Sequence, residues 1–136
     1  MRPIPPISHD AIDNKHYVGY VRPCNNKELI ALFIFNKHSD MEKVIGEPCR
    51  ACFIPFFKPK LDIIGGICFS KKEFKVELLI HECSHAAFHY MRTVKPKFSL
   101  GKHYRHLDKE GKEEERFCII NGNIGMGLFK ILQKLK

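Results

Sequence analysis

Two histidines four residues apart, with a glutamate directly after the first, are the side chains in this sequence best suited to chemistry. Residues 81–85 read His-Glu-Cys-Ser-His. Residues four apart on a helix lie on one face, so the imidazoles of His81 and His85 can reach one metal ion. Glu82 lies about 100° round such a helix from His81. It can therefore contact a zinc-bound water, whose pKa the metal lowers, and take its proton as the water attacks a carbonyl.

The sequence around this motif favours a metal site over two histidines that face solvent or hydrogen-bond in a core. Apolar residues 78–80 precede the motif, and Ala86 and Ala87 follow it within one predicted helix. A catalytic zinc keeps three protein ligands and one open position. The longer pattern H-E-x-x-H-x-x-G-x-x-H does not supply the third ligand here. Phe88 stands in place of its glycine and Met91 in place of its last histidine.

An acidic triplet near the start of the last predicted helix is the best source of the third ligand. Glu114 shares a helical face with Phe117, the face expected to pack on the motif helix, and Glu115 is the second choice. The triplet can also be a solvated helix start, which the helix dipole favours. His103 and His106 precede it in a polar segment and compete for the role, because a three-histidine site also suits zinc.

The motif requires a helix, and the sequence predicts one from about residue 70 to about residue 92. Ser70 and Glu73 fit a capping box that opens this helix, and Pro96 prevents it from extending far. Residues 95–111 then form a long, polar and basic loop, and long loops in compact domains are often functional.

The last segment, residues 112–136, is helical in pattern but contains glycines at positions 122, 125 and 127. Each glycine inside a helix costs about 1 kcal/mol relative to alanine. The sequence therefore predicts either a break near residues 121–123 or close packing against the motif helix.

The first half of the chain contains the strand signals. Residues 16–21 and 29–35 are rich in strand formers and predict an antiparallel pair, and residues 61–69 predict a further strand with two central glycines. Ser39 and Glu42 fit a second capping box, and the short helix that follows should stop at Gly46.

This order of elements predicts a single α+β domain over residues 1–136. A small, mainly antiparallel sheet packs on the motif helix and on a C-terminal helix. Residues 1–15 are polar and proline-rich, and we expect them to form a loosely attached arm.

Composition and charge limit the expected cellular compartment and the expected binding partners. The sequence is 44% hydrophobic, enough for a core, and has no run of about 18–20 apolar residues for a membrane span. We find no secretory signal, so the six cysteines are expected to be thiols in the cytoplasm. The net charge of +8 permits a nucleic-acid partner, but the lysines are spread along the chain, so this partner is not favoured.

Two other patterns are weaker. Cys49 and Cys52 form a lone C-x-x-C, which as a redox pair would want a βαβ context and as a structural zinc site would need two more ligands. Residues 122–127 have glycine spacing reminiscent of a phosphate loop but follow a helix pattern and lack the lysine, so packing glycines are favoured.

Taken together, these residues resemble the glutamate-type zinc metallopeptidases, the gluzincins, and within them the compact intracellular ImmA/IrrE-type and phage-encoded minimal domains. Residues 64–69 look like the strand that borders the cleft, residues 79–86 like the metal helix, and residues 114–118 like the helix that donates the third ligand. The resemblance covers roughly residues 61–128.

The resemblance implies a minimal zincin-like domain that binds Zn²⁺ through His81, His85 and Glu114. It also implies hydrolysis of peptide bonds in a protein substrate in the cytoplasm, or in the host cytoplasm if the chain is phage-encoded. The strand around residues 65–66 would align the substrate at the sheet edge. Tyr104, or His103, would stabilise the developing oxyanion. The alternative is a catalytically inactive module with the same fold that binds a protein partner or nucleic acid.

Overall fold

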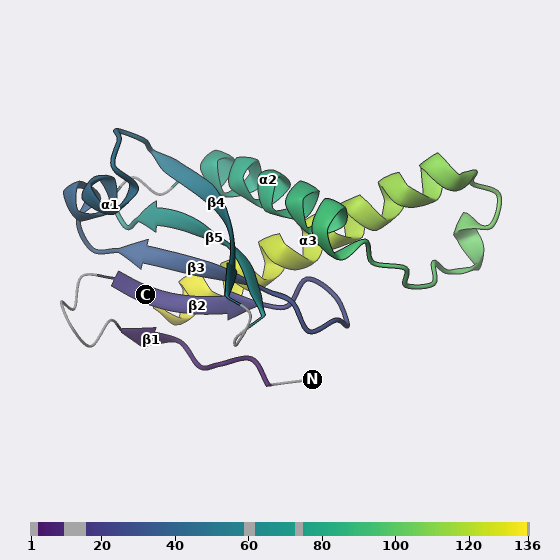
Figure 1. The fold of residues 1–136 in the computed structure, drawn as a ribbon, viewed down its shortest axis with the longest axis horizontal. Helices are drawn as coiled ribbons and strands as arrows, with labels where there is room; N and C mark the ends of the chain where they lie inside the picture. The colour runs from purple at the N-terminus through teal and green to yellow at the C-terminus, as the bar shows by residue number, and fades with distance from the viewer. Residues whose placement is uncertain (1–2, 10–15, 59–61, 73–74, 136) are drawn as a thin grey trace.

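The protein folds as one five-stranded sheet with two long helices against one face (Figure 1). The computed structural model describes residues 3–9, 16–58, 62–72 and 75–135. In chain order the elements are β1 (Ser8–His9), β2 (His16–Val21), β3 (Leu29–Phe35), α1 (His38–Ile45), β4 (Ala51–Lys58), β5 (Ile63–Ser70), α2 (Val76–Val94), the 3-10 turn η1 (Lys102–Tyr104) and α3 (Lys109–Lys134). The expectation of an α+β protein is confirmed.

The sheet is mixed, with the strand order β1-β2-β3-β5-β4. The pairs β1–β2, β2–β3 and β4–β5 are antiparallel, as the first expected hairpin required, whereas β3 and β5 are parallel. Part of the N-terminal segment expected to be a loose arm joins the sheet, with Ser8 opposite Val18. The strand with the two central glycines, β5, is paired on both sides. The expectation that it borders a cleft as the sheet edge is therefore wrong, and the edge beside it is β4.

The edge strand β4 was not predicted from the sequence, because Pro55 interrupts its apolar run. A proline lacks the N–H of a ladder hydrogen bond and is tolerated at edges and bulges. Pro55 lies opposite Gly65, and the pairing becomes irregular between Pro55 and Lys58. A Cβ at Gly65 would lie 2.5 Å from the Phe53 ring, so this glycine gives the edge strand room to approach.

Neither predicted capping box forms as expected. Helix α1 begins after Lys37, and α2 begins after Lys75, and neither residue makes a side-chain cap hydrogen bond. Ser39 lies inside α1, and Ser70 ends β5, where its buried hydroxyl lies 2.8 Å from Nδ1 of His38. Glu73 lies outside the described residues. A tertiary contact with His38 therefore occupies Ser70, and Ser39 lies two residues beyond the N-cap position of α1, too far into the helix to act as its cap.

The predicted helix ends are better reproduced. Gly46 ends α1 in the left-handed conformation, with φ at 90°, as a glycine stop should. Helix α2 ends at Val94, two residues before Pro96. Helix α3 begins slightly before the predicted start, where the Asp108 side chain accepts a hydrogen bond from the Gly111 N–H.

Helix α3 runs unbroken through its glycines, so the predicted break does not occur. At Gly127 the reason is close packing: a Cβ there would lie 2.7 Å from Val21 on β2. The neighbour is thus a strand, where the sequence suggested the motif helix. Gly122 and Gly125 have open space where a Cβ would be.

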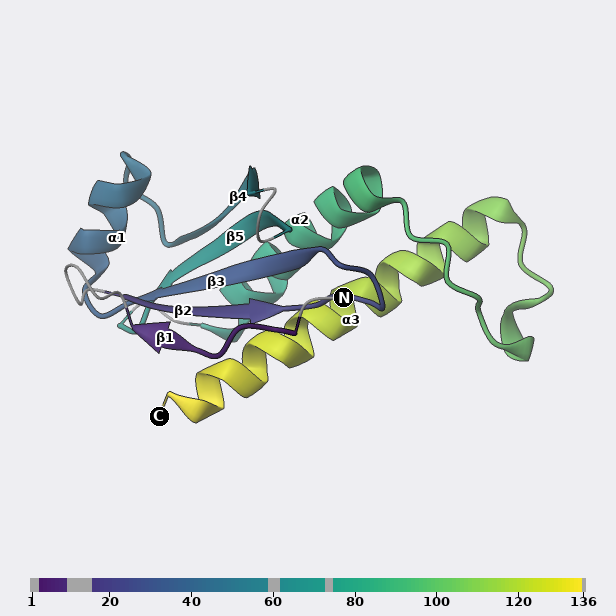
Figure 2. The same cartoon turned by 60° about the horizontal axis from the view of Figure 1, so that its bottom comes forward.

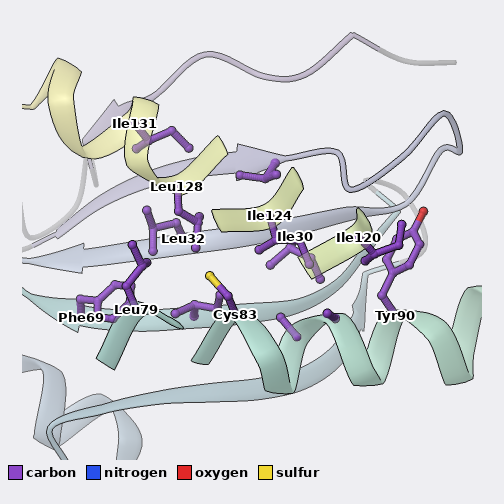
Figure 3. Packing of buried hydrophobic residues seen from close by; sticks show 14 of the residues in the cluster. Ile30, Leu32, Phe69, Leu79, Cys83, Tyr90, Ile120, Ile124, Leu128 and Ile131 are labelled. Atoms are coloured by element: carbon purple, nitrogen blue, oxygen red, sulfur yellow. The ribbon is translucent and has the colours of Figure 1, made fainter. Parts of the chain in front are cut away.

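The main core lies between the sheet and the two long helices (Figure 3). Ile30, Leu32 and Ile34, alternate residues of β3, face this core. Helices α2 and α3 present their buried stripes to it; the members are Leu79, Cys83, Ala86, Ala87, Tyr90, Ile120, Ile124, Leu128 and Ile131. Figure 2 shows α3 passing beside β2 and extending beyond the sheet at its N-terminal end.

Two long-range hydrogen bonds join the helices to the turn after β2. The Asn123 amide donates to the Pro23 carbonyl at 2.7 Å, and the Tyr90 hydroxyl lies 3.1 Å from the Cys24 sulfur. A smaller cluster, made of Phe35, Met41 and Cys68, holds α1 on the opposite face of the sheet. Among the described helices, none is long and apolar enough to cross a membrane.

Candidate metal centre

The two motif histidines lie side by side on the exposed face of α2. Their Nε2 atoms are 3.1 Å apart, and the ring centroids of His81 and His85 are 4.7 Å apart. Two nitrogens about 2.0–2.1 Å from one tetrahedral zinc lie roughly 3.3–3.4 Å from each other. The spacing therefore fits two ligands of one ion. The same geometry also permits a hydrogen bond between the rings when one nitrogen carries a proton and the other does not.

Glu82 has a different environment from the histidines that flank it. Its side chain is buried, with 6% of the residue exposed. Glu82 and His85 both line a hollow of about 410 Å³ between α2 and the edge strand β4. The other lining residues are Cys52, Phe53, Pro55, Phe88, His89 and Arg92. The glutamate and one of the two histidines therefore meet at a cavity large enough for a substrate side chain.

Apolar and aromatic side chains line the hollow together with the polar side chains of α2, among them Arg92. Phe53 lies on β4 beside His89, with ring centroids 5.5 Å apart, and His89 Nε2 lies 3.1 Å from the Ile64 carbonyl oxygen. His89 therefore ties α2 to the sheet. Arg92, one turn further along α2, lies over the Phe88 ring at 5.5 Å. The sequence reasoning did not single out Arg92 or the β4 residues of this hollow.

Thiols surround the buried glutamate. Burial raises the pKa of Cys52 to about 11 and that of Cys83 to about 12, and the charge of Glu82 adds to both shifts. Cys52 lies opposite Cys68 in the sheet, and burial raises the pKa of Cys49 and Cys68 too. Raised pKa values keep these thiols protonated at neutral pH, which disfavours nucleophilic or redox chemistry at the C-x-x-C pair.

The four candidate third ligands lie away from the histidine pair. The first turns of α3 project beyond the C-terminal end of α2 in both ribbon views (Figures 1 and 2). Glu114 is exposed on this projecting part, next to the half-buried Glu115. His85 lies nine residues before the end of α2 at Val94, about 13 Å along the axis.

His103 and His106 are exposed in the segment that joins the two helices. Within residues 3–9, 16–58, 62–72 and 75–135, no three His, Cys, Asp or Glu side chains come close enough to hold a metal ion. The described structure thus brings together two of the three predicted ligands, His81 and His85, and leaves the third apart from them.

Tyr104, the candidate oxyanion donor, also lies apart from the motif. It ends η1 and lines a separate cavity with Arg105, Lys112 and Arg116. This cavity shares no residue with the hollow beside Glu82. The arrangement therefore brings together a closely spaced histidine pair, a buried carboxylate and an edge strand in one place, and a basic cavity in another.

Comparisons with protein-family models, with curated proteins and with solved structures found no match for this chain. The resemblance to zinc metallopeptidases therefore rests on the motif residues themselves and on their geometry.

Proposed function

We propose that the protein is a zinc-dependent metallopeptidase in which His81 and His85 hold the metal and Glu82 is the general base. The observation that carries the proposal is the combination on one helix of a histidine pair spaced for one ion and a buried carboxylate beside it. Burying a carboxylate costs free energy, so a glutamate without a functional role is expected to face solvent. The burial of Glu82 therefore supports a role for its carboxylate.

The residues around the motif would have separate roles in catalysis and in substrate binding. A bound zinc ion would supply Lewis acidity toward a substrate carbonyl and would make water easier to deprotonate. Glu82 would take the proton of the attacking water and deliver it to the leaving amine. The edge strand β4 offers unpaired backbone groups along which a peptide could extend. The hollow beneath it, with Phe53 and Arg92, would receive a substrate side chain.

The third ligand is the part of the proposal that depends on sequence alone. Glu114, with Glu115, His103 and His106 as alternatives, would have to approach the histidine pair through an arrangement of α3 and its preceding segment different from the one described. The alternative function is a module of the same fold that binds a partner and hydrolyses nothing.

Peptide hydrolysis by the zinc-loaded protein tests the proposal directly. The purified chain is incubated with a proteome-derived peptide library, and new termini are identified by mass spectrometry. We expect cleavage by the wild type and a loss of about 100-fold or more in Glu82→Gln, because general bases contribute about 10²–10⁴-fold. Glu77→Gln is the matched control, since Glu77 is an exposed glutamate near the start of the same helix.

Each outcome decides between the two functions. Cleavage that survives in Glu77→Gln but not in Glu82→Gln supports the peptidase. Equal activity in all three proteins points to a contaminating protease and counts against it. A zinc-loaded protein that cleaves nothing in the library favours the binding module.

A further inference from the structure

A second polar cavity lies on the part of the molecule that projects from the body. It has a volume of about 170 Å³ and lies between the segment after α2 and the first turns of α3. Its polar side chains are those of Ser99, Tyr104, Arg105, Lys112 and Arg116. We call this cavity the basic cup.

The backbone holds the basic cup in shape. Lys112 and Arg116 lie one turn apart on α3 and therefore on the same face. The Arg116 Nε donates a 3.0 Å hydrogen bond to the Phe98 carbonyl, which fixes the segment after α2 against α3. The Tyr104 N–H donates to the Gly101 carbonyl at 3.0 Å and closes the turn that carries Arg105. Hydrogen bonds thus hold the Arg116 side chain and the backbone of the turn that carries Arg105 before any ligand arrives.

The positive charge in the basic cup is poorly neutralised. Among the described residues that line the cavity, none carries a carboxylate. Glu113 lies 3.3 Å from one terminal nitrogen of Arg116 and is its ion-pair partner. In the part of the chain that the structure describes, Arg105 and Lys112 have no ion-pair partner. Three cations around one small cavity repel one another, so an anion between them would lower the free energy.

We propose that the basic cup binds a phosphate group. Guanidinium groups bind phosphate oxygens through paired N–H donors, and a lysine adds a point charge. The hydroxyls of Ser99 and Tyr104 can donate to the remaining oxygens. At about 30 Å³ per water, the cavity holds the equivalent of roughly five or six waters, enough for one phosphate. The net charge of +8 would draw such anions toward the surface.

The same chemistry can come from a free phosphate, from a terminal phosphate or from the phosphodiester backbone of a nucleic acid. Binding by the full-length chain is measured for inorganic phosphate by calorimetry. It is measured by fluorescence anisotropy for one single-stranded oligonucleotide with and without a 5′-phosphate. The double variant Arg105→Gln/Lys112→Gln removes two cup cations. Lys97→Gln/Lys109→Gln removes the same charge from exposed positions nearby that do not line the cavity.

The cup variant should weaken binding by about tenfold or more, and the control by less than about twofold, because only the cup variant loses charge-assisted hydrogen bonds to the phosphate. A 5′-phosphate requirement, together with binding of inorganic phosphate, identifies a terminal or free phosphate. Equal binding of both oligonucleotides, lost only in the cup variant, identifies the backbone. Glu82→Gln should bind like the wild type, so this inference stands apart from the peptidase proposal.

Three results would overturn the proposal. The first is no binding of any of the three probes by the wild type. The second is an equal loss in the two double variants, which would mean that general surface charge attracts the anion. The third is unchanged binding in the cup variant. Circular dichroism and a thermal melt establish that each variant is folded, and Lys112→Gln alone serves if the double variant is not.

Discussion

The Nε2 atoms of His81 and His85 lie 3.1 Å apart at the surface of α2, one helical turn from each other. Helical geometry alone brings the two nitrogens together, so the pair needs no second element to form. The buried carboxylate between them in sequence points into the hollow under β4. A metal at this pair would thus lie at the rim of that hollow.

Zinc content is the first property that this geometry predicts. We expect about one zinc per chain in the wild type by elemental analysis, and near-normal content in Glu82→Gln, because Glu82 is not a proposed ligand. His81→Ala removes a ligand and should weaken zinc binding by more than about 100-fold, since even outer partners of ligands are worth about 10–100-fold. A wild type that neither contains zinc nor takes up added zinc would refute the metal site.

A measurement of zinc affinity also tests the third ligand. In the described arrangement Glu114 is exposed on the projecting part of α3, so Glu114→Gln should leave zinc affinity within about twofold of the wild type. A loss comparable to that of His81→Ala would show that Glu114 is a ligand and that α3 adopts another position when metal binds. Glu110→Gln, at an exposed glutamate in the first turn of the same helix, is the control.

Glycines in α3 should respond in opposite ways to alanine. Gly122→Ala places a Cβ in open space and should stabilise the protein by about 0.5–1 kcal/mol through helix propensity. Gly127→Ala places a Cβ 2.7 Å from Val21 and should be destabilising, because overpacking costs about 1–3 kcal/mol against a propensity gain of about 1. Denaturant unfolding measures both. If Val21→Ala relieves the Gly127→Ala defect, the contact is its cause.

Substituting the two serines of the predicted capping boxes distinguishes a local capping contribution to stability from a tertiary one. Ser70→Ala removes a buried hydroxyl 2.8 Å from His38 and should cost about 1 kcal/mol of unfolding free energy. Ser39→Ala lies inside α1 and should be neutral or slightly stabilising, whereas loss of a true cap costs about 1 kcal/mol. A reversed order in chemical denaturation would restore the capping prediction.

Thiol reactivity should follow burial and pKa. Cys118 is exposed and should be alkylated first at pH 7.5, while Cys52 and Cys83 should react slowly because their pKa values are raised to about 11 and about 12. Mass spectrometry of peptides labelled with iodoacetamide gives the rates. The rate at Cys52 should rise as the pH passes 9 and approaches 11. Rapid labelling of Cys83 at pH 7.5 would contradict the described core.

The raised pKa of Cys83 also makes the unfolding free energy depend on pH, with stability falling as the pH rises. The folded state favours the protonated thiol, so this contribution is fully present below the unfolded pKa near 9 and is lost as the pH rises toward 12. The unfolding free energy of the wild type should therefore fall more steeply between pH 9 and pH 11 than that of Cys83→Ala.

Local patterns in the sequence were sufficient for much of this protein. Runs of strand-forming residues predicted β2 and β3, because such residues favour a strand wherever they are consecutive in the chain. The end of α2 was predicted within two residues, but its start lies about six residues after the predicted one. Gly46 and Pro96 predicted helix ends through backbone geometry that is local to them. The spacing of His81 and His85 predicted their proximity for the same reason.

Only the tertiary structure decided the features that depend on residues far apart in sequence. Strand β4 exists because β5 offers it an edge to pair with, which outweighs the disruption from Pro55. The need for glycine at position 127 comes from Val21 on a distant strand. The burial of the Ser70 hydroxyl depends on its hydrogen-bond partner His38 on α1. The position of Glu114 follows from how far α3 projects beyond α2, and the basic cup follows from the turn that folds back on Lys112. Such pairings depend on the packing of whole elements, and no local pattern in the chain records them.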